Sequence, residues 1–289
     1  MVTETPPLLG INLKSATQRW GHLQQEASVH LPGANLYQID AVDWRTLPVD
    51  MAQLPITLFS RYLLTFPEKQ SNHRVSHRQI DTLSMVAIFM SHMKCWRWLV
   101  DHPNEKCALV LEDDACFDPA FSRSWEHTIR PLLEHTEQWD VLVLGFFASV
   151  GPETIMYVPN THPPLSTMVL AQFFGAHAYL VTQRGATILL NHSLPLDHQV
   201  DGLFLTLHEL GLLRLRMLRT SVVSQCIDAE NREGSWHTHS INSPHHISLS
   251  VEHTLRAWQV FAVLVLVAAV TGWFLWFTSS CTEYMRKIK

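Results

Sequence analysis

Short apolar runs alternate with longer amphipathic segments along residues 9–225 of this chain. The apolar runs are typical of buried strands, and the segments between them repeat their apolar positions at the helical interval. Strands are predicted at 10–13, 35–42, 107–113, 139–145, 176–181, 213–219 and 222–225, and helices at 16–26, 82–100, 119–135, 184–190 and 198–210. Residues 48–72 and the proline-rich stretch 152–164 carry no regular pattern. Strands that alternate with helices predict one α/β domain with a mainly parallel central sheet.

The predicted helix at 82–100 has a continuous apolar face, and a histidine lies on it. The face consists of Met85, Ile88, Phe89, His92, Met93, Trp96 and Leu99. A polar group on such a face is normally satisfied by a hydrogen bond. We therefore expect His92 to be a buried, hydrogen-bonded residue rather than a ligand.

A different pattern occupies the C-terminal part of the chain. Residues 257–277 carry no charge, and tryptophans stand at both ends of this segment (Trp258, Trp273 and Trp276). About 20 apolar residues suffice to span a bilayer, and tryptophan favours its interfaces. The pattern predicts a main domain at 1–235, a His- and Ser-rich linker at 236–256, a transmembrane helix at 257–278 and a short basic tail at 279–289. The alternative for the apolar segment is a buried core helix.

Two signals disagree on the orientation of this predicted anchor. Residues 1–7 have neither the basic start nor the apolar run of a signal peptide, which favours a cytosolic body with a single-pass C-terminal anchor. Arg286, Lys287 and Lys289 after the span favour a cytosolic tail instead. We give more weight to the missing signal, because a body of this size rarely crosses a membrane without one.

Charge and cysteine usage narrow the classes of partner. The net charge is −5 and the basic residues are scattered, so the chain shows no nucleic-acid footprint. The five cysteines have neither the number nor the spacing of a disulfide framework or a zinc site (Cys95, Cys107, Cys116, Cys226 and Cys281). Cysteine usage therefore predicts a reducing compartment.

Three consecutive acids, Glu112, Asp113 and Asp114, close the apolar run 107–111. Open α/β sheets bind ligands at the carboxyl ends of their strands. Side chains alternate along a strand, so Glu112 and Asp114 are expected on one side and Asp113 on the other. Two neighbouring carboxylates repel each other unless a cation lies between them, which predicts a divalent metal on Asp114 and Glu112. The alternative is a solvated strand end whose acids cap the next helix.

Several motifs follow one another in an order that resembles a known enzyme family. They are Ile11-Asn12-Leu13 with Arg19, Ile39–Asp43, Ser91-His92 with Trp96, Leu109–Ala115, Trp139–Gly145, Ala178–Ala186 and Pro195–Asp201, followed by Gln225 and Ser235. In this order they resemble glycosyltransferase family 25, which contains bacterial lipooligosaccharide galactosyltransferases and the procollagen galactosyltransferase domains. The resemblance covers most of residues 9–236.

The resemblance implies a GT-A-like fold, a UDP-sugar donor carrying galactose or glucose, and a divalent metal, usually Mn²⁺, with Mg²⁺ as the second choice. In GT-A-like enzymes the first acid of the motif more often contacts the ribose and the last holds the metal. This implies donor contact for Glu112 and metal binding for Asp114, while Asp113 could serve either task. Such enzymes often draw a further metal ligand from the late loop, which points to His237 or His239. We prefer the alternative that these histidines belong to a flexible linker.

The remaining site residues follow from their positions. Asn12 lies near the end of the first predicted strand and Arg19 follows it, where hydrogen-bond donors to uracil or pyrophosphate would lie. Arg19 is alternatively a solvated helix residue. The family is mostly inverting, which requires one displacement and one general base. Asp197 and Asp201 are four residues apart, hence on one face if this stretch is helical. Asp201 is our preferred base, whereas Asp197 is the second candidate or a cap of the helix at 198–210.

We therefore expect a metal-dependent glycosyltransferase that moves a hexose to a hydroxyl of a glycan, glycolipid or glycoprotein acceptor. A magnesium phosphatase with an aspartyl nucleophile also uses acids at a strand end. Here, however, the first acid is Glu112, and the residues after the acids are Ala115-Cys116-Phe117 rather than Thr or Ser. A membrane-tethered, non-catalytic sugar-binding or scaffold module is the non-enzymatic alternative, and the intact acids argue against it.

Overall fold

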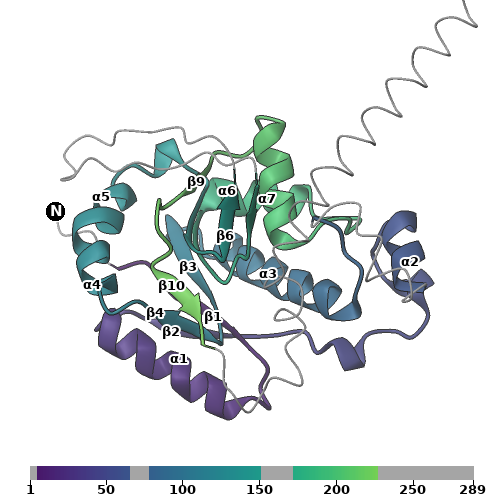
Figure 1. The fold of residues 1–289 in the computed structure, drawn as a ribbon, viewed down its shortest axis with the longest axis horizontal. Coiled ribbons are helices and arrows are strands. Elements are labelled where there is room, and N and C mark those ends of the chain that lie inside the picture. Colours follow the sequence, from purple (N-terminus) through teal and green to yellow (C-terminus); the bar gives the residue numbers. More distant parts are fainter. Residues whose placement is uncertain (1–4, 66–77, 151–171, 227–289) are drawn as a thin grey trace, which may run out of the picture. The chain divides into compact units, whose positions relative to one another are not determined.

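The computed structural model describes residues 5–65, 78–150 and 172–226 (Figure 1). The chain divides into two compact units, Met1–Asp228 and Ala229–Lys289, and every described residue lies in the first. The strands are β1 (Leu8–Asn12), β2 (Leu36–Asp40), β3 (Cys107–Glu112), β4 (Ala115–Phe117), β5 (Val141–Gly145), β6 (Ala148–Val150), β7 (Gln172–Phe174), β8 (Ala178–Thr182), β9 (Leu215–Met217) and β10 (Val223–Gln225). The α-helices are α1 (Thr17–His30), α2 (Leu58–Thr65), α3 (Leu83–Asp101), α4 (Phe121–Ser124), α5 (Arg130–Leu133), α6 (Gln183–Asn191) and α7 (Val200–Glu209).

The central sheet has six strands in the order β2-β1-β3-β8-β5-β9. β1 pairs in parallel with β2 and β3, and β5 pairs in parallel with β9. β8 runs antiparallel to both of its neighbours, β3 and β5. The prediction of a mainly parallel sheet is confirmed. Because β8 is reversed, its first residue, Ala178, lies beside Leu111, so the segment before β8 reaches the carboxyl end of β3.

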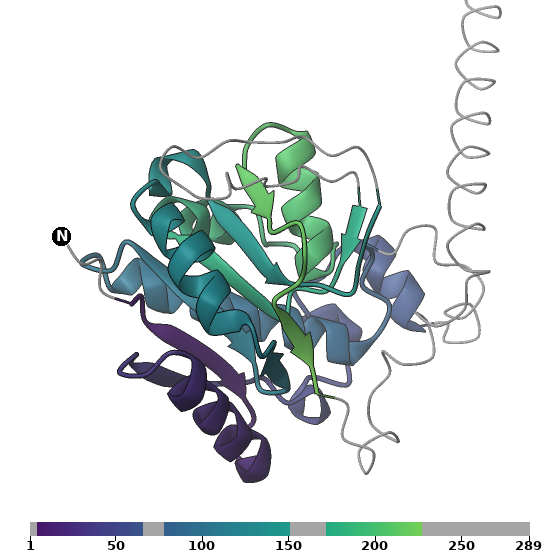
Figure 2. The same ribbon diagram turned by 60° about the vertical axis from the view of Figure 1, so that its left-hand side comes forward.

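Helices cover both faces of the sheet, which explains why its inner strands are apolar on both sides (Figures 1 and 2). In β5, Leu142 and Leu144 pack in one apolar cluster with residues of α1, α4 and α5. Val141 and Val143 pack in the other cluster with residues of α3, α6 and α7. Alternating side-chain direction along each strand thus divides the core into two layers.

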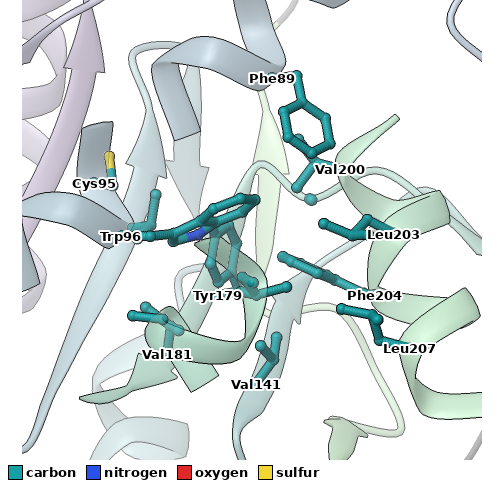
Figure 3. Packing of buried hydrophobic residues seen from close by; sticks show 14 of the residues in the cluster. Phe89, Cys95, Trp96, Val141, Tyr179, Val181, Val200, Leu203, Phe204 and Leu207 are labelled. Atoms are coloured by element: carbon teal, nitrogen blue, oxygen red, sulfur yellow. The ribbon is translucent and has the colours of Figure 1, made fainter. Parts of the chain in front are cut away.

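Large aromatic side chains join α3 and α7 to the centre of the sheet (Figure 3). Trp96 of α3, Tyr179 of β8 and Phe204 of α7 are wholly buried. The ring of Phe204 lies 6.2 Å from that of Trp96 and 5.1 Å from that of Tyr179, measured between centroids. Full burial of a side chain of this size stabilises the fold by about 2 to 3 kcal/mol.

The predicted elements of the sheet and its main helices are confirmed with shifted ends. The helix predicted at 119–135 consists of α4 and α5 joined by a wider π-helical turn over Trp125–Ile129. Pro131 follows this turn and has no N–H to donate to the preceding turn, which accounts for the local irregularity. The pattern did not predict α2, which lies in the stretch 48–72, nor the three-residue strands β4, β6 and β7.

The predicted membrane anchor lies outside the described residues, together with the linker at 236–256, the tail at 279–289, Ser235, His237 and His239. Within the described part of the chain, no helix is both long enough and apolar enough to cross a bilayer.

Candidate active site

The three acids of the motif lie where β3 ends and the chain turns into β4. β10 runs antiparallel to β4, which places Gln225 opposite Ala115. Gln225 Nε2 donates hydrogen bonds to Glu112 Oε2 at 2.9 Å and to Asp114 Oδ1 at 3.3 Å. A single carboxamide therefore contacts both carboxylates, and Glu112 and Asp114 face the same side as predicted.

Asp113 is directed at the last residue of β1 and at a residue of α1. Asn12 Nδ2 donates to Asp113 Oδ2 at 2.7 Å, and the Arg19 guanidinium lies 2.5 Å from Asp113 Oδ1. The same guanidinium lies 3.3 Å from Asp114 Oδ2. The parallel pairing of β1 with β3 brings these residues together, because the carboxyl ends of parallel strands meet at one edge. Arg19 is thus an ion-pair partner of the acids rather than an ordinary solvated helix residue.

Asn12 is buried, and the protein satisfies its carboxamide fully. Nδ2 donates to Ala16 O at 3.1 Å as well as to Asp113, while Oδ1 accepts a hydrogen bond from Gln38 Nε2 at 2.8 Å. These contacts make Asn12 a support for Asp113. Its contact with the UDP-sugar stays a prediction. Sequence reasoning missed Gln38. Its polar side chain in β2, the strand beside β1, is the signal that could have found it.

The electrostatics of the motif fit a hard divalent cation. Burial, followed by the charge of Glu112, raises the pKa of Asp114 to about 7, although Arg19 acts in the opposite direction. Burial also raises the pKa of Asp113, against the lowering effects of Arg19 and Asn12. Asp113 and Asp114 thus share one guanidinium, and carboxylate oxygens are ligands that Mn²⁺ and Mg²⁺ prefer. Asp114, with Glu112 beside it, has the chemistry to hold such an ion.

Asp201 is linked to the same edge of the sheet. It lies in the first turn of α7, where Oδ2 accepts a hydrogen bond from Gly175 N at 3.0 Å and Oδ1 accepts one from Gly202 N at 2.8 Å. Gly175 has a φ of 91°, a conformation that favours glycine. Close by in the chain, the carbonyl of His177 accepts a hydrogen bond from the backbone N–H of Glu112 at 2.9 Å. The segment 175–177 thus connects the first turn of α7 with the acid motif.

Asp197 has different neighbours. Its Oδ1 accepts a hydrogen bond from Thr57 Oγ1 at 2.7 Å and lies 3.5 Å from Ser60 Oγ. Because α7 begins at Val200, the stretch is not helical at Asp197, so Asp197 and Asp201 do not share a helix face, and Asp197 does not cap the helix either. Its side chain connects the loop before α7 to the start of α2.

His177 is a buried residue of this edge that sequence reasoning missed. Its Nε2 donates to Val223 O at 2.9 Å, and its Nδ1 has no hydrogen-bond partner among residues 5–65, 78–150 and 172–226. Burial lowers the pKa of His177, although the charge of Glu112 acts in the opposite direction. A neutral ring is consistent with both its burial and its single hydrogen bond.

A disulfide lies next to the contacts of Gln225. It joins Cys116 of β4 to Cys226, whose Cα atoms are 5.5 Å apart, and the N–H of Cys226 donates to Asp114 O at 2.7 Å. The expectation that the chain has no disulfide was wrong, because the two cysteines are 110 positions apart and meet only through the pairing of β4 with β10. Because the chain has this disulfide, its cysteine usage no longer supports a reducing compartment. The compartment itself stays a prediction.

His22 approaches this disulfide, with Nε2 3.5 Å from Cys116 Sγ. In the described part of the chain, His22, Cys116 and Cys226 are the one group of three potential metal ligands whose atoms all lie within 4.8 Å of one another. Both sulfurs are engaged in the disulfide, so this group offers no thiolates.

The model of the family described as "Glycosyltransferase family 25 (LPS biosynthesis protein)" matches residues 6–204. This span contains β1, α3, the whole acid motif and Asp201. The chain belongs to glycosyltransferase family 25. The resemblance inferred from the ordered motifs is confirmed, and the chain is a glycosyltransferase.

Solved structures resemble this glycosyltransferase only remotely. One is a glycosyltransferase involved in the glycosylation of the major capsid of PBCV-1, with 11% identity over 65% of this chain and 67% of that chain and a TM-score of 0.28. A UTP-bound UGPase from Acinetobacter baumannii is 9% identical, and the match covers 74% of this chain and 87% of that chain with a TM-score of 0.37. The inositol-1-phosphate CTP transferase from T. maritima is 9% identical, and the match covers 81% of this chain and 96% of that chain with a TM-score of 0.37. No curated protein matches the chain.

The Ser-His pair that contributes to the resemblance has two separate tasks in this family 25 enzyme. Ser91 Oγ accepts a hydrogen bond from Val42 N at 2.8 Å and donates to Ala87 O at 2.7 Å, which holds the loop after β2 against α3. His92 is 1% exposed, and its Nε2 lies 3.3 Å from Glu112 Oε1. The prediction that His92 is buried and hydrogen-bonded is confirmed, and its partner is the first acid of the motif.

Proposed function

We propose that this glycosyltransferase moves a hexose, galactose or glucose, from a UDP-sugar to a hydroxyl of a glycan, glycolipid or glycoprotein acceptor. We further propose that transfer inverts the anomeric carbon and depends on Mn²⁺ or Mg²⁺. The observation that supports this best is the acid motif at the end of β3, where Glu112 and Asp114 face the same side. Carboxyl groups whose pKa values burial raises favour a bound cation, and the end of a strand is where α/β sheets bind ligands.

Each acid has a different task in this proposal. Asp114 would hold the cation and Glu112 would contact the ribose of the donor, while Gln225 keeps both carboxylates on one side. Asp113 is turned away from them by Asn12 and Arg19, which supports a structural task for it. When bound, the cation supplies positive charge against the negative charge that develops on the leaving diphosphate.

Arg19 is the residue best suited to meet the pyrophosphate. Its side chain is 43% exposed although it pairs with Asp113 and Asp114. A guanidinium binds phosphate oxygens with the same two-pronged geometry that it uses for carboxylates. Arg19 can therefore serve the acids in the free enzyme and the donor in the complex.

For the general base we propose Asp201, with Asp197 as the second candidate. Asp201 is connected through the segment 175–177 to the edge that carries the acids. Two backbone N–H groups fix the direction of its carboxylate, as proton transfer at a defined position requires. Asp197 contacts α2 instead, which places it with a different part of the fold.

Release of UDP from a panel of UDP-sugars tests the proposal directly. We expect the full chain in detergent to release UDP from one sugar with Mn²⁺ and to lose this activity with a chelator. Asp114→Asn should abolish the metal-dependent release, whereas Asp101→Asn, which removes the charge of an exposed acid at the end of α3, should not. Full activity of Asp114→Asn would remove the metal from this residue, and release that is insensitive to chelator would remove the metal altogether.

We also propose that the apolar segment 257–278 anchors the enzyme in a membrane by a single span, with the catalytic body in the cytosol; the Cys116–Cys226 disulfide favours the opposite, oxidising side, and a protease experiment decides between the two. Its length and lack of charge support the anchor. Alkaline carbonate should leave the chain in the membrane pellet, and protease added to intact cytosol-out vesicles should degrade the body. Extraction by carbonate would contradict the anchor, and a protected body would reverse the orientation.

A further inference from the structure

A chain of buried hydrogen bonds leads from the aromatic core to Glu112. Its members are Trp96 and His92 of α3 and Tyr179 of β8, which are all 1% exposed or less. Trp96 Nε1 and His92 Nδ1 each lie 2.9 Å from the Tyr179 hydroxyl oxygen. His92 Nε2 lies 3.3 Å from Glu112 Oε1. Trp96 and Tyr179 belong to the packed cluster of Figure 3, so the chain of hydrogen bonds begins in the close-packed core.

The chemistry of these groups assigns each proton in the chain. The indole N–H of Trp96 can only donate, so the Tyr179 oxygen accepts from it. Burial raises the pKa of Tyr179 well above its usual value, so the hydroxyl keeps its own proton. Among the residues that the structure describes, the remaining partner for that proton is Nδ1 of His92, which must therefore accept. The ring proton of His92 is then on Nε2, directed at Glu112.

Glu112 is held on both of its oxygens by this arrangement. His92 Nε2–H donates to Oε1, and Gln225 Nε2–H donates to Oε2. The two donors come from α3 and β10, which are on separate parts of the chain. A glutamate has several rotatable bonds, and donors at both oxygens restrict them to one direction of the carboxylate. The rings of His92 and Tyr179 are stacked, with centroids 5.7 Å apart and planes 20° from parallel, which restricts the imidazole in turn.

We propose that His92 is a positioning residue of the transfer reaction: Tyr179 and Trp96 hold it in its Nε2–H tautomer, and it directs the Glu112 carboxylate toward the donor. The effect on transfer rests on the proposed function. The tautomer and the contact with Glu112 do not, so they can be tested without any turnover. In metal sites, loss of such a supporting donor typically reduces affinity or activity by about 10- to 100-fold.

Nitrogen NMR of the full chain in detergent, labelled with ¹⁵N-histidine, tests the tautomer. The spectrum of a His92→Gln variant identifies the His92 signals by their loss. We expect a protonated Nε2 and an unprotonated Nδ1, and we expect Tyr179→Phe to change the Nδ1 signal because the donor is removed. A doubly protonated ring, a proton on Nδ1, or no response to Tyr179→Phe would overturn the assignment.

Two isosteric variants test the positioning. Glutamine places an amide nitrogen near the position of Nε2 and can still donate to Glu112, whereas asparagine places its amide near Nδ1 and cannot reach. We expect His92→Asn to lower kcat/KM for UDP release by about 10- to 100-fold, and His92→Gln to recover much of this loss. Thermal unfolding of each variant separates these effects from loss of the fold.

Ser91→Ala is the matched control, because Ser91 is the buried neighbour of His92 but bonds to Val42 and Ala87 instead. Its kcat/KM should stay within about twofold of the wild type. Equal losses in folded His92→Asn and His92→Gln, or wild-type rates in both, would overturn the positioning role. If the wild type releases no UDP from any sugar, the proposed function fails, while the NMR experiment still decides the tautomer.

Discussion

Asp140 allows a stability prediction with a defined dependence on pH. It is wholly buried just before β5 and binds arginines from two distant segments. Its carboxylate accepts hydrogen bonds from Arg184 of α6, from the backbone N–H of Arg214 at 2.7 Å and from Arg214 Nη2 at 2.8 Å. Burial alone would raise the pKa of Asp140, but the hydrogen bonds from Arg214 and Arg184 outweigh it and lower the pKa.

The perturbation is Asp140→Asn, which removes the charge at nearly constant volume. It also places an amide donor against guanidinium donors. Removing one partner of a buried ion pair costs about 3 to 5 kcal/mol. The side chains of Arg184 and Arg214 are 54% and 37% exposed and can be rehydrated, so we expect the lower end, about 3 kcal/mol. In a domain of about 200 residues this corresponds to a fall in Tm of about 6 to 12 °C.

The sign of the pH dependence follows from the lowered pKa. The unfolded chain has an aspartate pKa of about 3.9, above that of the folded state. The charged carboxylate therefore stabilises the fold fully at pH values above the unfolded pKa, and this stability is lost as pH falls through the folded pKa. The difference in unfolding free energy between wild type and Asp140→Asn should be constant from neutral pH to about pH 5 and shrink below about pH 4.

Urea unfolding followed by tryptophan fluorescence at a series of pH values measures this difference. Asp101→Asn is the control, because Asp101 is exposed, and its effect should stay within about 0.5 kcal/mol. Equal stability of wild type and Asp140→Asn at neutral pH would refute the reasoning. A difference that persists unchanged in acid would show that packing, rather than charge, explains the loss.

Three further predictions concern the site. Asp201→Asn should retain UDP binding by calorimetry while stopping turnover, and normal turnover would move the base to Asp197 or elsewhere. Gln225→Ala should weaken Mn²⁺ binding in the presence of UDP by about tenfold, because Asp114 and Glu112 lose their shared hydrogen-bond donor. An unchanged manganese titration would show that Gln225 does not support the metal site. Ser224→Ala, at an exposed residue, is the control. Peptide mapping without reductant should recover Cys116 and Cys226 in one linked fragment, and free thiols at both positions would contradict the disulfide.

The sequence predicted those parts of the fold that a local pattern encodes. The strand at 107–113 was evident because a buried inner strand must be apolar on both faces. The helix at 82–100 was evident because its apolar face repeats at the helical interval. The same two patterns placed Glu112 and Asp114 at a strand end and His92 in the core, and the structure confirms both.

Long-range pairing carries no such local signal, and the predictions failed there. The composition of β8 is that of any buried strand, so nothing in it indicates that it runs antiparallel to β3. The disulfide depends on β10 lying beside β4, and Cys116 and Cys226 show no recognisable spacing. Asp197 was interpreted as a second candidate base or as a cap of the helix at 198–210, whereas its contact with Thr57 depends on the position of α2.

The hydrogen-bond partners of the three acids also come from segments that are distant in the sequence. The carboxyl groups of the motif meet different hydrogen-bond donors: Asp113 meets Asn12, and Glu112 meets His92. Asn12 and His92 are both buried, and both are uncharged when His92 carries its ring proton on Nε2 alone. They are therefore suited to hold the acids in place throughout a catalytic cycle. Arg19 is charged and 43% exposed, and a diphosphate would compete with the acids for it. Binding of the UDP-sugar should therefore move the guanidinium of Arg19 and leave the buried hydrogen bonds of the motif unchanged.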